Sequence, residues 1–250
     1  MVLGFLFAGF GELLLFAATA LTILVNMGQL TGNVVSRNIY ITSIDARNIG
    51  TSLSNTTGST TALFASDQSV ATGSGEGLKL QYYWGPYRQC GGEGVNFPRG
   101  CSDSYIGYRW EPLATLESDA SPTISSEIAA AIPSGYVTDN DRLGLLSRVA
   151  NVILLVGTIL TGLAFLTGFL AHRFCFAFAA LECLGAAGCL AVAAAIWTAI
   201  LVKTRDAVPT GVELVIHYGN GLWMTWAAFA AVAVAIVPLL LACCVGRSKY

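Results

Sequence analysis

Charged residues are scarce in this chain. Of its 250 residues, 13 are Lys or Arg and 15 are Asp or Glu, so 11% are charged. An average soluble domain has roughly 25%. The net charge of −2 provides no basic patch of the kind that nucleic-acid binding requires. The composition therefore argues against an ordinary soluble domain and predicts no nucleic-acid partner.

Histidine is almost absent as well, with two copies. His172 and His217 are far apart in the sequence, and neither has a second histidine nearby to complete a zinc site. No Ser/His/Asp set and no phosphate-binding loop can be recognised. The glycine-rich segment 73–77 opens no helix, so it is interpreted as a flexible turn. The sequence predicts a protein that is not an enzyme and holds neither a metal nor a cofactor.

Long apolar runs are what the sequence does contain, and 54% of its residues are hydrophobic. A bilayer core about 30 Å thick is crossed by about 20 apolar residues in a helix. Four segments meet this requirement. The expected fold class is a membrane all-α four-helix transmembrane bundle with a small extracellular β-rich domain. The expected segments are transmembrane helices at 1–29, 145–171, 174–202 and 221–245, an extracellular domain at 30–144, a cytosolic turn at 172–173, a second extracellular loop at 203–220 and a cytosolic tail at 246–250.

The first apolar segment has an alternative interpretation as a cleaved signal peptide. Ala18-Thr19-Ala20 fits the small-residue rule for a cleavage site. However, no basic residue precedes the apolar run, and the run continues past this tripeptide. We expect the segment to remain as a transmembrane helix.

The short loops carry too few basic residues to orient the chain by the positive-inside rule. Two other features place the long loop outside the cytosol. Asn55-Thr56-Thr57 is an N-glycosylation sequon in a Ser/Thr-rich stretch. Cys90 and Cys101 are the two cysteines of that loop, and an isolated pair in a polar domain indicates a disulfide formed in an oxidising compartment. Both termini are then expected in the cytosol.

The long loop shows patterns of both strands and a helix. Strands separated by Gly-rich turns are expected at 34–44, 60–64, 78–84 and 105–110. A short helix with Ser/Thr caps is expected at 123–132. Because Leu, Ile and Val are few in this loop, we expect it to need the disulfide and the membrane helices for stability.

The segment Trp84-Gly85-Pro86-Tyr87-Arg88-Gln89-Cys90, followed after ten residues by Cys101, resembles the claudin signature. That signature runs Trp, Gly-Leu-Trp, Cys and a second Cys. Tyr87 stands where the pattern has its second Trp, and Pro86 replaces Leu, which argues against a true animal claudin. The resemblance implies a disulfide that joins two strands and a flat aromatic that packs the sheet and faces the membrane surface.

The overall plan is more similar to the fungal tetraspan family that includes the eisosome-associated Sur proteins and the PalI pH-response proteins. Residues 218–226, Tyr-Gly-Asn-Gly-Leu-Trp-Met-Thr-Trp, are similar to the Gly-…-Thr-Trp opening of that family's fourth span. The resemblance implies a plasma-membrane organiser or sensor that packs laterally. PalI-like members often carry long tails, so the short tail at 246–250 fits the eisosome-associated branch better.

Two acidic residues, Glu12 and Glu182, lie inside expected spans. Ionisable groups within a bilayer are costly, which makes a functional role a natural hypothesis. Both lie about a third of the way into their spans from the expected cytosolic face, so they could meet. Two acids at one level would share a proton or bind a cation. The alternatives are a protonated Glu that is hydrogen-bonded between helices, or a Glu close enough to an interface to reach water.

Cysteines and aromatic residues mark the expected membrane boundaries. Cys243 and Cys244 end the fourth span and are candidates for S-palmitoylation, or else ordinary small apolar residues. The aromatic residues expected as interface anchors are Trp197, Tyr218, Trp223 and Trp226.

We expect the protein to organise a plasma-membrane microdomain by lateral self-association or by binding other membrane proteins and lipids, with a role in cell wall, endocytosis or stress sensing. The small residues around Gly185 and Gly188 would pack either within the bundle or against another copy. The alternative function is a small ion channel or regulator of calcium entry that uses Glu12 and Glu182. Unbroken helices without an evident inverted repeat give this alternative little support.

Overall fold

The computed structural model describes residues 2–49, 63–131, 139–170, 173–208 and 214–245. Within them, four helices are long and apolar enough to cross a membrane, at Leu6–Asn26, Asn140–Phe169, Cys175–Ala207 and Asn220–Cys243. Helices of this length satisfy their own backbone polar groups while they cross hydrocarbon. The chain is therefore a multi-pass membrane protein. The four helices, a small antiparallel sheet and a disulfide confirm the expected fold class.

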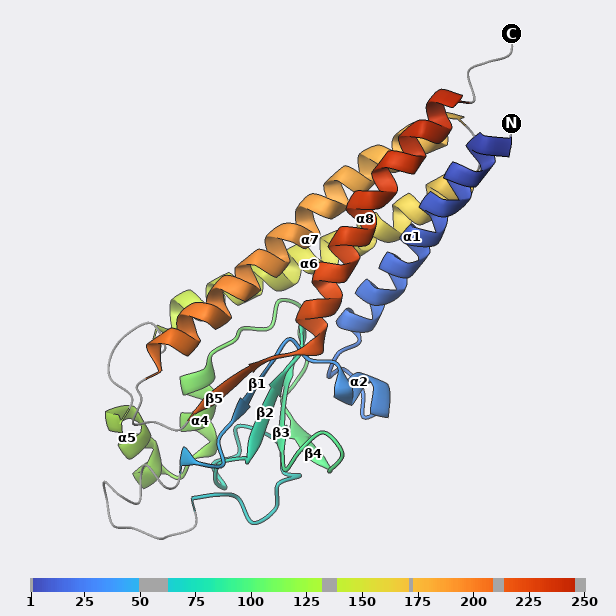
Figure 1. Cartoon of the computed structure of the whole chain (residues 1–250). Helices are drawn as coiled ribbons and strands as arrows, with labels where there is room; N and C mark the ends of the chain where they lie inside the picture. Colours follow the sequence, from blue (N-terminus) through green and yellow to red (C-terminus); the bar gives the residue numbers. More distant parts are fainter. Residues whose placement is uncertain (1, 50–62, 132–138, 171–172, 209–213, 246–250) are drawn as a thin grey trace. The chain divides into compact units, whose positions relative to one another are not determined.

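The elements follow one another in a simple order (Figure 1). They are α1 (Val2–Asn26), α2 (Val34–Asn38), β1 (Thr42–Asp45), β2 (Gln81–Trp84), β3 (Gln89–Gly92), β4 (Arg99–Cys101), α4 (Pro112–Asp119), α5 (Pro122–Ala131), α6 (Asn140–Phe169), α7 (Arg173–Ala207), β5 (Val215–Tyr218) and α8 (Asn220–Val245). With four crossings, the chain between α1 and α6 and the chain between α7 and α8 lie on the same side of the membrane.

The chain divides into two compact units. The helix unit comprises Met1–Asn26, Val152–Ala195 and Trp223–Tyr250, and the sheet unit comprises Met27–Asn151 and Ile196–Leu222. Helices α6, α7 and α8 contribute residues to both units.

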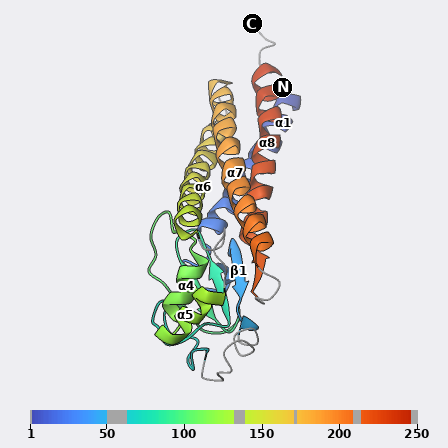
Figure 2. The same cartoon turned by 90° about the vertical axis from the view of Figure 1, so that its left-hand side faces the viewer.

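Small side chains dominate the core of the helix unit. Its buried residues include Ala18, Ala164, Ala179, Ala180, Ala186, Ala228, Val232 and Ala235. A Cβ atom added to Gly11 of α1 would lie 3.2 Å from Leu239 of α8, so these two helices approach closely at this glycine. Within this unit α6 lies beside α7 (Figure 2). Because lipid is as apolar as the side chains, such close packing, not hydrophobic burial, is what holds membrane helices together.

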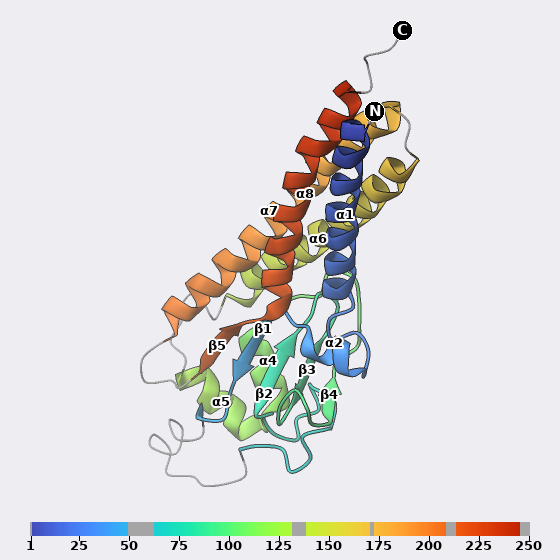
Figure 3. The same ribbon diagram turned by 45° about the vertical axis from the view of Figure 1, so that its right-hand side comes forward.

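The sheet has five strands in the order β4-β3-β2-β1-β5, and all neighbours are antiparallel (Figure 3). Strand β5 comes from the second loop, after α7, and pairs with β1 in the register Thr42 to Tyr218. The two loops therefore build one sheet, although more than 150 residues separate the partners of this strand pair along the chain. This pairing was not predicted from the sequence.

Helix α4 lies against one face of the sheet (Figure 2). Thr115 of α4 donates a hydrogen bond to Oε1 of Gln89 in β3 over 2.9 Å, and Leu113 and Leu116 are buried beside it. The preceding Pro112 is compatible with the first turn of a helix, where its missing N–H costs nothing.

Two of the predicted strands were wrong. Residues 34–38 of the expected strand 34–44 form the short helix α2, and β1 begins only at Thr42. Residues 105–110 form a turn and irregular chain, not a strand. In both places local contacts prevail over the β propensity of the side chains. The Arg37 amide donates to the carbonyl of Asn33, and the tilted rings of Tyr105 and Tyr108 lie 4.7 Å apart. The helix expected at 123–132 is α5.

Candidate functional site

The claudin-like signature forms the turn between β2 and β3. Trp84, the last residue of β2, is fully buried, and its ring lies 5.9 Å from that of Tyr82 and 6.3 Å from that of Trp110. Trp110 in turn meets Trp197 of α7 edge to face at 6.2 Å. Trp84 thus packs inside the sheet unit, as the resemblance implies for the signature aromatic. The half-buried Tyr87 follows in the turn.

The same row of rings corrects the role of Trp197. It was expected as an interface anchor, but it is 2% exposed and belongs to the core of the sheet unit. Trp223, by contrast, is 64% exposed at the start of α8, as an anchor requires. Aromatic rings thus serve two purposes here, core packing at Trp197 and exposure to lipid or interface at Trp223.

Gly85 in this signature has no room for a side chain. A Cβ atom there would overlap the carbonyl oxygen of Gly28 and would lie 3.0 Å from the Cβ of Gln29. The amide of Gly85 donates to the carbonyl of Arg88 over 3.0 Å and closes the turn. The glycine of the signature therefore lets the β2–β3 turn rest directly on the segment that follows α1.

The disulfide closes the neighbouring hairpin. Cys90 of β3 and Cys101 of β4 are directly opposite in the strand register and are joined by a disulfide bond. The amide of Ser102 then donates to the carbonyl of Gln89 over 3.0 Å and extends the pairing by one step. The bond fixes the edge hairpin of a sheet that has few large aliphatic residues of its own.

Gln29 organises the chain between α1 and the sheet. It is 1% exposed and adopts a φ of 59°, which is uncommon outside glycine. Its side-chain amide donates to the carbonyls of Arg37 (2.8 Å) and Ile39 (3.1 Å), and its Oε1 accepts from Arg99 (3.0 Å). Its own carbonyl accepts from Nε of Arg88. Sequence reasoning missed this residue, whose one signal is a polar side chain directly after the last apolar turn of a span.

The sheet unit also contains a buried polar network around Lys79 and Asp119, both 0% exposed. Lys79 Nζ donates to the carbonyl of Asp67 over 3.2 Å, and Asp119 accepts from the amide of Gly73. Burial lowers the pKa of Lys79 and raises that of Asp119, and the attraction between the two charges works against both shifts. These contacts hold the chain between Asp67 and Lys79 against the end of α4.

The two acids in the helix unit converge on one step of α6. Glu182 of α7 accepts a hydrogen bond from Oγ1 of Thr167 over 2.7 Å. Glu12 of α1 lies against the next residue, since a Cβ atom added to Gly168 would overlap its carboxylate. Neither carboxylate oxygen of Glu12 has a hydrogen-bond partner among the described residues. The two acids therefore contact neighbouring residues of α6, Glu182 at Thr167 and Glu12 at Gly168.

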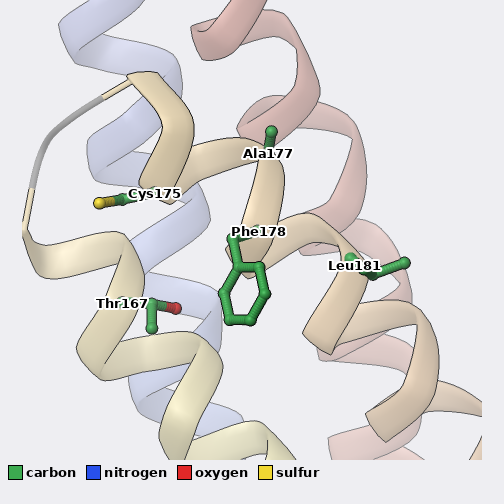
Figure 4. A pocket seen from close by; sticks show the side chains of 5 residues that line it. All are labelled: Thr167, Cys175, Ala177, Phe178 and Leu181. Carbon is green, nitrogen blue, oxygen red and sulfur yellow. The ribbon is translucent and has the colours of Figure 1, made fainter.

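An apolar groove opens near these acids in the helix unit. Thr167 of α6 and Cys175, Ala177, Phe178 and Leu181 of α7 line this groove, which has a volume of about 540 Å³ (Figure 4). Its walls suit a hydrocarbon chain, and Thr167 contributes the one hydroxyl. Among the described residues no group of three or more His, Cys, Asp or Glu comes together in a way that would hold a metal ion.

The modification candidates are placed only in part. Cys243 is half-buried in the last turn of α8, where Cys244 follows it. Asn55 lies outside the described residues.

A protein-family model described as the SUR7/PalI family matches residues 7–245. The match covers all four membrane helices and every strand of the sheet. A search among curated proteins found no match to the chain.

Proposed function

Because the chain belongs to the SUR7/PalI family, we propose that it is a non-enzymatic organiser of the plasma membrane that associates laterally with further copies of itself. Assembly through the membrane helices would concentrate the protein in a microdomain of the eisosome type. Other membrane proteins would join through the same helix faces. Such a domain would influence the cell wall, endocytosis or stress sensing.

One face of α7 carries this proposal. Gly185 and Gly188 are both exposed, and a Cβ atom added to Gly188 would meet no atom within 4 Å. Leu181 and Leu184 on the same face are 62% and 57% exposed. Small residues on a lipid-exposed helix face let a second helix approach until the backbones are in contact, which is the main source of attraction between helices in lipid. The chain itself leaves the space above Gly188 open for such a helix.

The test compares two glycines at which an added Cβ atom would meet no atom of the same copy within 4 Å. Gly162 of α6 also has no atom within 4 Å of an added Cβ atom, so Gly162→Leu is a matched control for Gly188→Leu. Subunits are counted by stepwise photobleaching of labelled protein in liposomes. The wild type and Gly162→Leu are expected to show several bleaching steps per particle, and Gly188→Leu mainly one. A wild type that stays monomeric in lipid and diffuses freely in cells would refute the proposal.

The side of the membrane that each loop occupies is part of the same proposal. The disulfide between Cys90 and Cys101 and the sequon at Asn55 support an extracellular sheet unit with both termini in the cytosol. A C-terminally tagged copy, treated with endoglycosidase and with cysteine-labelling reagent, tests this orientation. Stable plasma-membrane patches with a glycan on Asn55 are expected. A diffuse internal signal with freely labelled Cys90 and Cys101 would contradict it.

The arrangement around Thr167 and Gly168 favours one alternative, a small cation pathway. Glu12 and Glu182 approach the same step of α6, and Glu12 has no partner among the described residues. Calcium or proton flux into proteoliposomes that is abolished by Glu12→Gln would move this alternative ahead of the organiser. Absence of flux in the wild type would remove it.

A further inference from the structure

Three arginines gather around Gln29 in the sheet unit. Arg99 of β4 donates through its two terminal nitrogens to Oε1 of Gln29 and to the carbonyls of Arg37 and Val95, each over 3.0 Å. Arg88 donates through Nε to the carbonyl of Gln29. Arg37 of α2 donates to the carbonyls of Gly32 (2.8 Å) and Phe97 (3.3 Å). Helix α2 lies beside β3 and β4 (Figure 3).

These arginines are held by neutral oxygens alone. In the part of the chain that the structure describes, both ion pairs involve Arg109, and none involves Arg37, Arg88 or Arg99. Burial lowers the pKa of Arg99, and the neighbouring charge of Arg37 lowers it further, while its ring contact with Tyr83 at 4.2 Å opposes this shift. Arg37, Arg88 and Arg99 thus have no carboxylate partner among the described residues, and the charges of Arg37 and Arg99 act on each other, which leaves an uncompensated demand for an anion.

The terminal nitrogens of Arg88 and one of those of Arg37 are available to such an anion. Arg88 uses only Nε, and Arg37 uses Nε and one terminal nitrogen, so the remaining donors make no hydrogen bond within the described residues. Both side chains are partly exposed. Arg99 is engaged through both of its terminal nitrogens, and it therefore positions Gln29 and Arg37 instead of contacting a ligand directly.

The chain connects this cluster to the ends of two membrane helices. Helix α2 begins eight residues after the end of α1. At its other end, the side chain of Asn220, the first residue of α8, donates to the carbonyl of Asn38 over 2.7 Å and accepts from the amide of Tyr40 over 3.2 Å. A segment tied to the ends of two membrane helices lies at the level where lipid headgroups are found.

Exposed apolar side chains surround the same cluster. Val34 and Val35 of α2 are 69% and 58% exposed, and Phe97, whose carbonyl accepts from Arg37, is 52% exposed. Apolar side chains next to basic ones are typical of segments that lie in the interface, with the apolar part among the lipid chains and the charges at the phosphates. The planar fork of a guanidinium matches two phosphate oxygens at once.

We propose that Arg37 and Arg88, positioned by Arg99 and Gln29 and flanked by the exposed valines of α2, bind the phosphate group of a phospholipid in the leaflet that adjoins the sheet unit. The lipid phosphate supplies the anion that the chain lacks at this place. Its acyl chains lie beside Val34 and Val35. Binding joins the sheet unit to the bilayer at a point separate from the α7 face, so it does not depend on self-association.

Native mass spectrometry of the full chain, released from detergent after incubation with defined lipids, tests the proposal. Phosphatidylglycerol is the probe, and diacylglycerol with the same acyl chains is the lipid without a phosphate. Arg37→Gln combined with Arg88→Gln is expected to weaken phosphatidylglycerol retention roughly tenfold or more, since two charge-assisted contacts are lost. Arg47→Gln is the matched control, because Arg47 also donates to a carbonyl, that of Glu93, but lies beyond the other end of β1.

A second double variant and a soluble anion provide two further tests of lipid binding. Val34→Ser combined with Val35→Ser changes only exposed side chains, so it is expected to fold normally and still to retain less lipid. Equal retention of diacylglycerol and phosphatidylglycerol would overturn the proposal, as would unchanged retention in both double variants. Protection against thermal unfolding by inorganic phosphate, at the concentration at which phosphatidylglycerol protects, would identify a soluble anion as the ligand and would also overturn it.

Discussion

The indole Nε1 of Trp197 donates a hydrogen bond to Oδ1 of Asn151 over 3.1 Å. The side-chain nitrogen of the same amide donates to the carbonyl of Tyr108 over 2.9 Å. One asparagine, 2% exposed, therefore joins α6, α7 and the irregular chain after β4 within the sheet unit. The amide satisfies two buried polar groups, which is why a polar residue is stable at this position.

Asn151→Leu is predicted to destabilise the sheet unit more than its change in size alone explains. The indole N–H and the Tyr108 carbonyl would both lose their partner, and each buried group left unpaired costs about 1–3 kcal/mol. Thermal unfolding of the full chain in detergent, followed by near-UV circular dichroism, measures the effect. Val149→Ala, on an exposed position of the same helix, is expected to leave the transition nearly unchanged. Equal transitions in the two variants would contradict the bridging role.

Gly85→Ala is predicted to destabilise the sheet unit by about 1–3 kcal/mol, since overpacking against backbone cannot be relieved by a rotamer change. The added methyl group would overlap the Gly28 carbonyl, whereas a methyl group on the nearby Gly32 would meet nothing within 4 Å. Gly32→Ala is therefore the control, expected to unfold like the wild type. The denaturation midpoints of the two variants measure this loss of stability. A midpoint for Gly85→Ala within error of the control would show that the turn can move to accept the methyl group.

Breaking the disulfide is predicted to cost about 2–3 kcal/mol, the value that chain entropy gives for a loop of this length. Cys90→Ala combined with Cys101→Ala removes it without leaving a thiol. The wild type should lose thermal stability when dithiothreitol is added, and the double variant should not respond to reductant. A response of the double variant would mean that other cysteines contribute a second bond.

The sequence predicted the fold class because the four spans and the cysteine pair are strong local signals. An apolar segment of more than 20 residues crosses the lipid as a helix, so these four helices can be predicted from composition alone. Strand β5 escaped prediction because its partner β1 is remote in the chain, and four residues of edge strand carry too little pattern. The valines at 34–35 favoured a strand, yet α2 forms there, where the Ser36 carbonyl accepts the amide of Gln29 over 2.9 Å.

Only part of the candidate site could be predicted, again because local motifs are visible in the sequence and contacts between remote segments are not. Trp84, Gly85 and the disulfide belong to a recognisable motif, whereas Gln29 and the three arginines around it come from four separate segments. No spacing rule connects positions 29, 37, 88 and 99, because only the folded sheet brings them together. The similar depth of Glu12 and Glu182 against neighbouring residues of α6 could be predicted, since position along a membrane helix follows directly from residue number.

The sheet unit is predicted to lose stability between about pH 10 and pH 12. Burial raises the pKa of Tyr108 from 10.0 to about 12 and also raises those of Tyr82, Tyr83 and Tyr87. A group whose pKa is higher in the folded state than in the unfolded state contributes its full stabilisation of the fold at a pH below the unfolded-state pKa. This contribution is lost as the pH rises through the folded-state pKa, by about 1.4 kcal/mol per unit of pKa difference. Lys79, whose pKa is lowered, contributes in the opposite sense and offsets part of the loss.

Absorbance at 295 nm and near-UV circular dichroism, recorded together from pH 8 to pH 13, measure this transition. A fraction of the tyrosines should ionise only together with the loss of the dichroic signal, and Tyr108→Phe should make the stability curve less steep. Ionisation of all tyrosines near pH 10 with the fold intact would show that the phenols are not shielded.

Gly168→Ala is predicted to disturb the helix unit through Glu12. The new methyl group would overlap the Glu12 carboxylate, so α1 must move away from α6 or the side chain must turn toward lipid, at a cost of about 1–3 kcal/mol. Gly162→Ala on the same helix meets nothing within 4 Å and serves as the control. Resistance to unfolding by sodium dodecyl sulfate in mixed micelles compares the two variants.

The double variant Gly168→Ala with Glu12→Ala, in which the overlap no longer exists, gives the decisive test. Its stability should match that of Glu12→Ala alone, because the two positions interact directly. An additive loss in the double variant would show that Gly168 is small for a reason unrelated to Glu12, and the two acids would then have to be treated as separate features of the bundle.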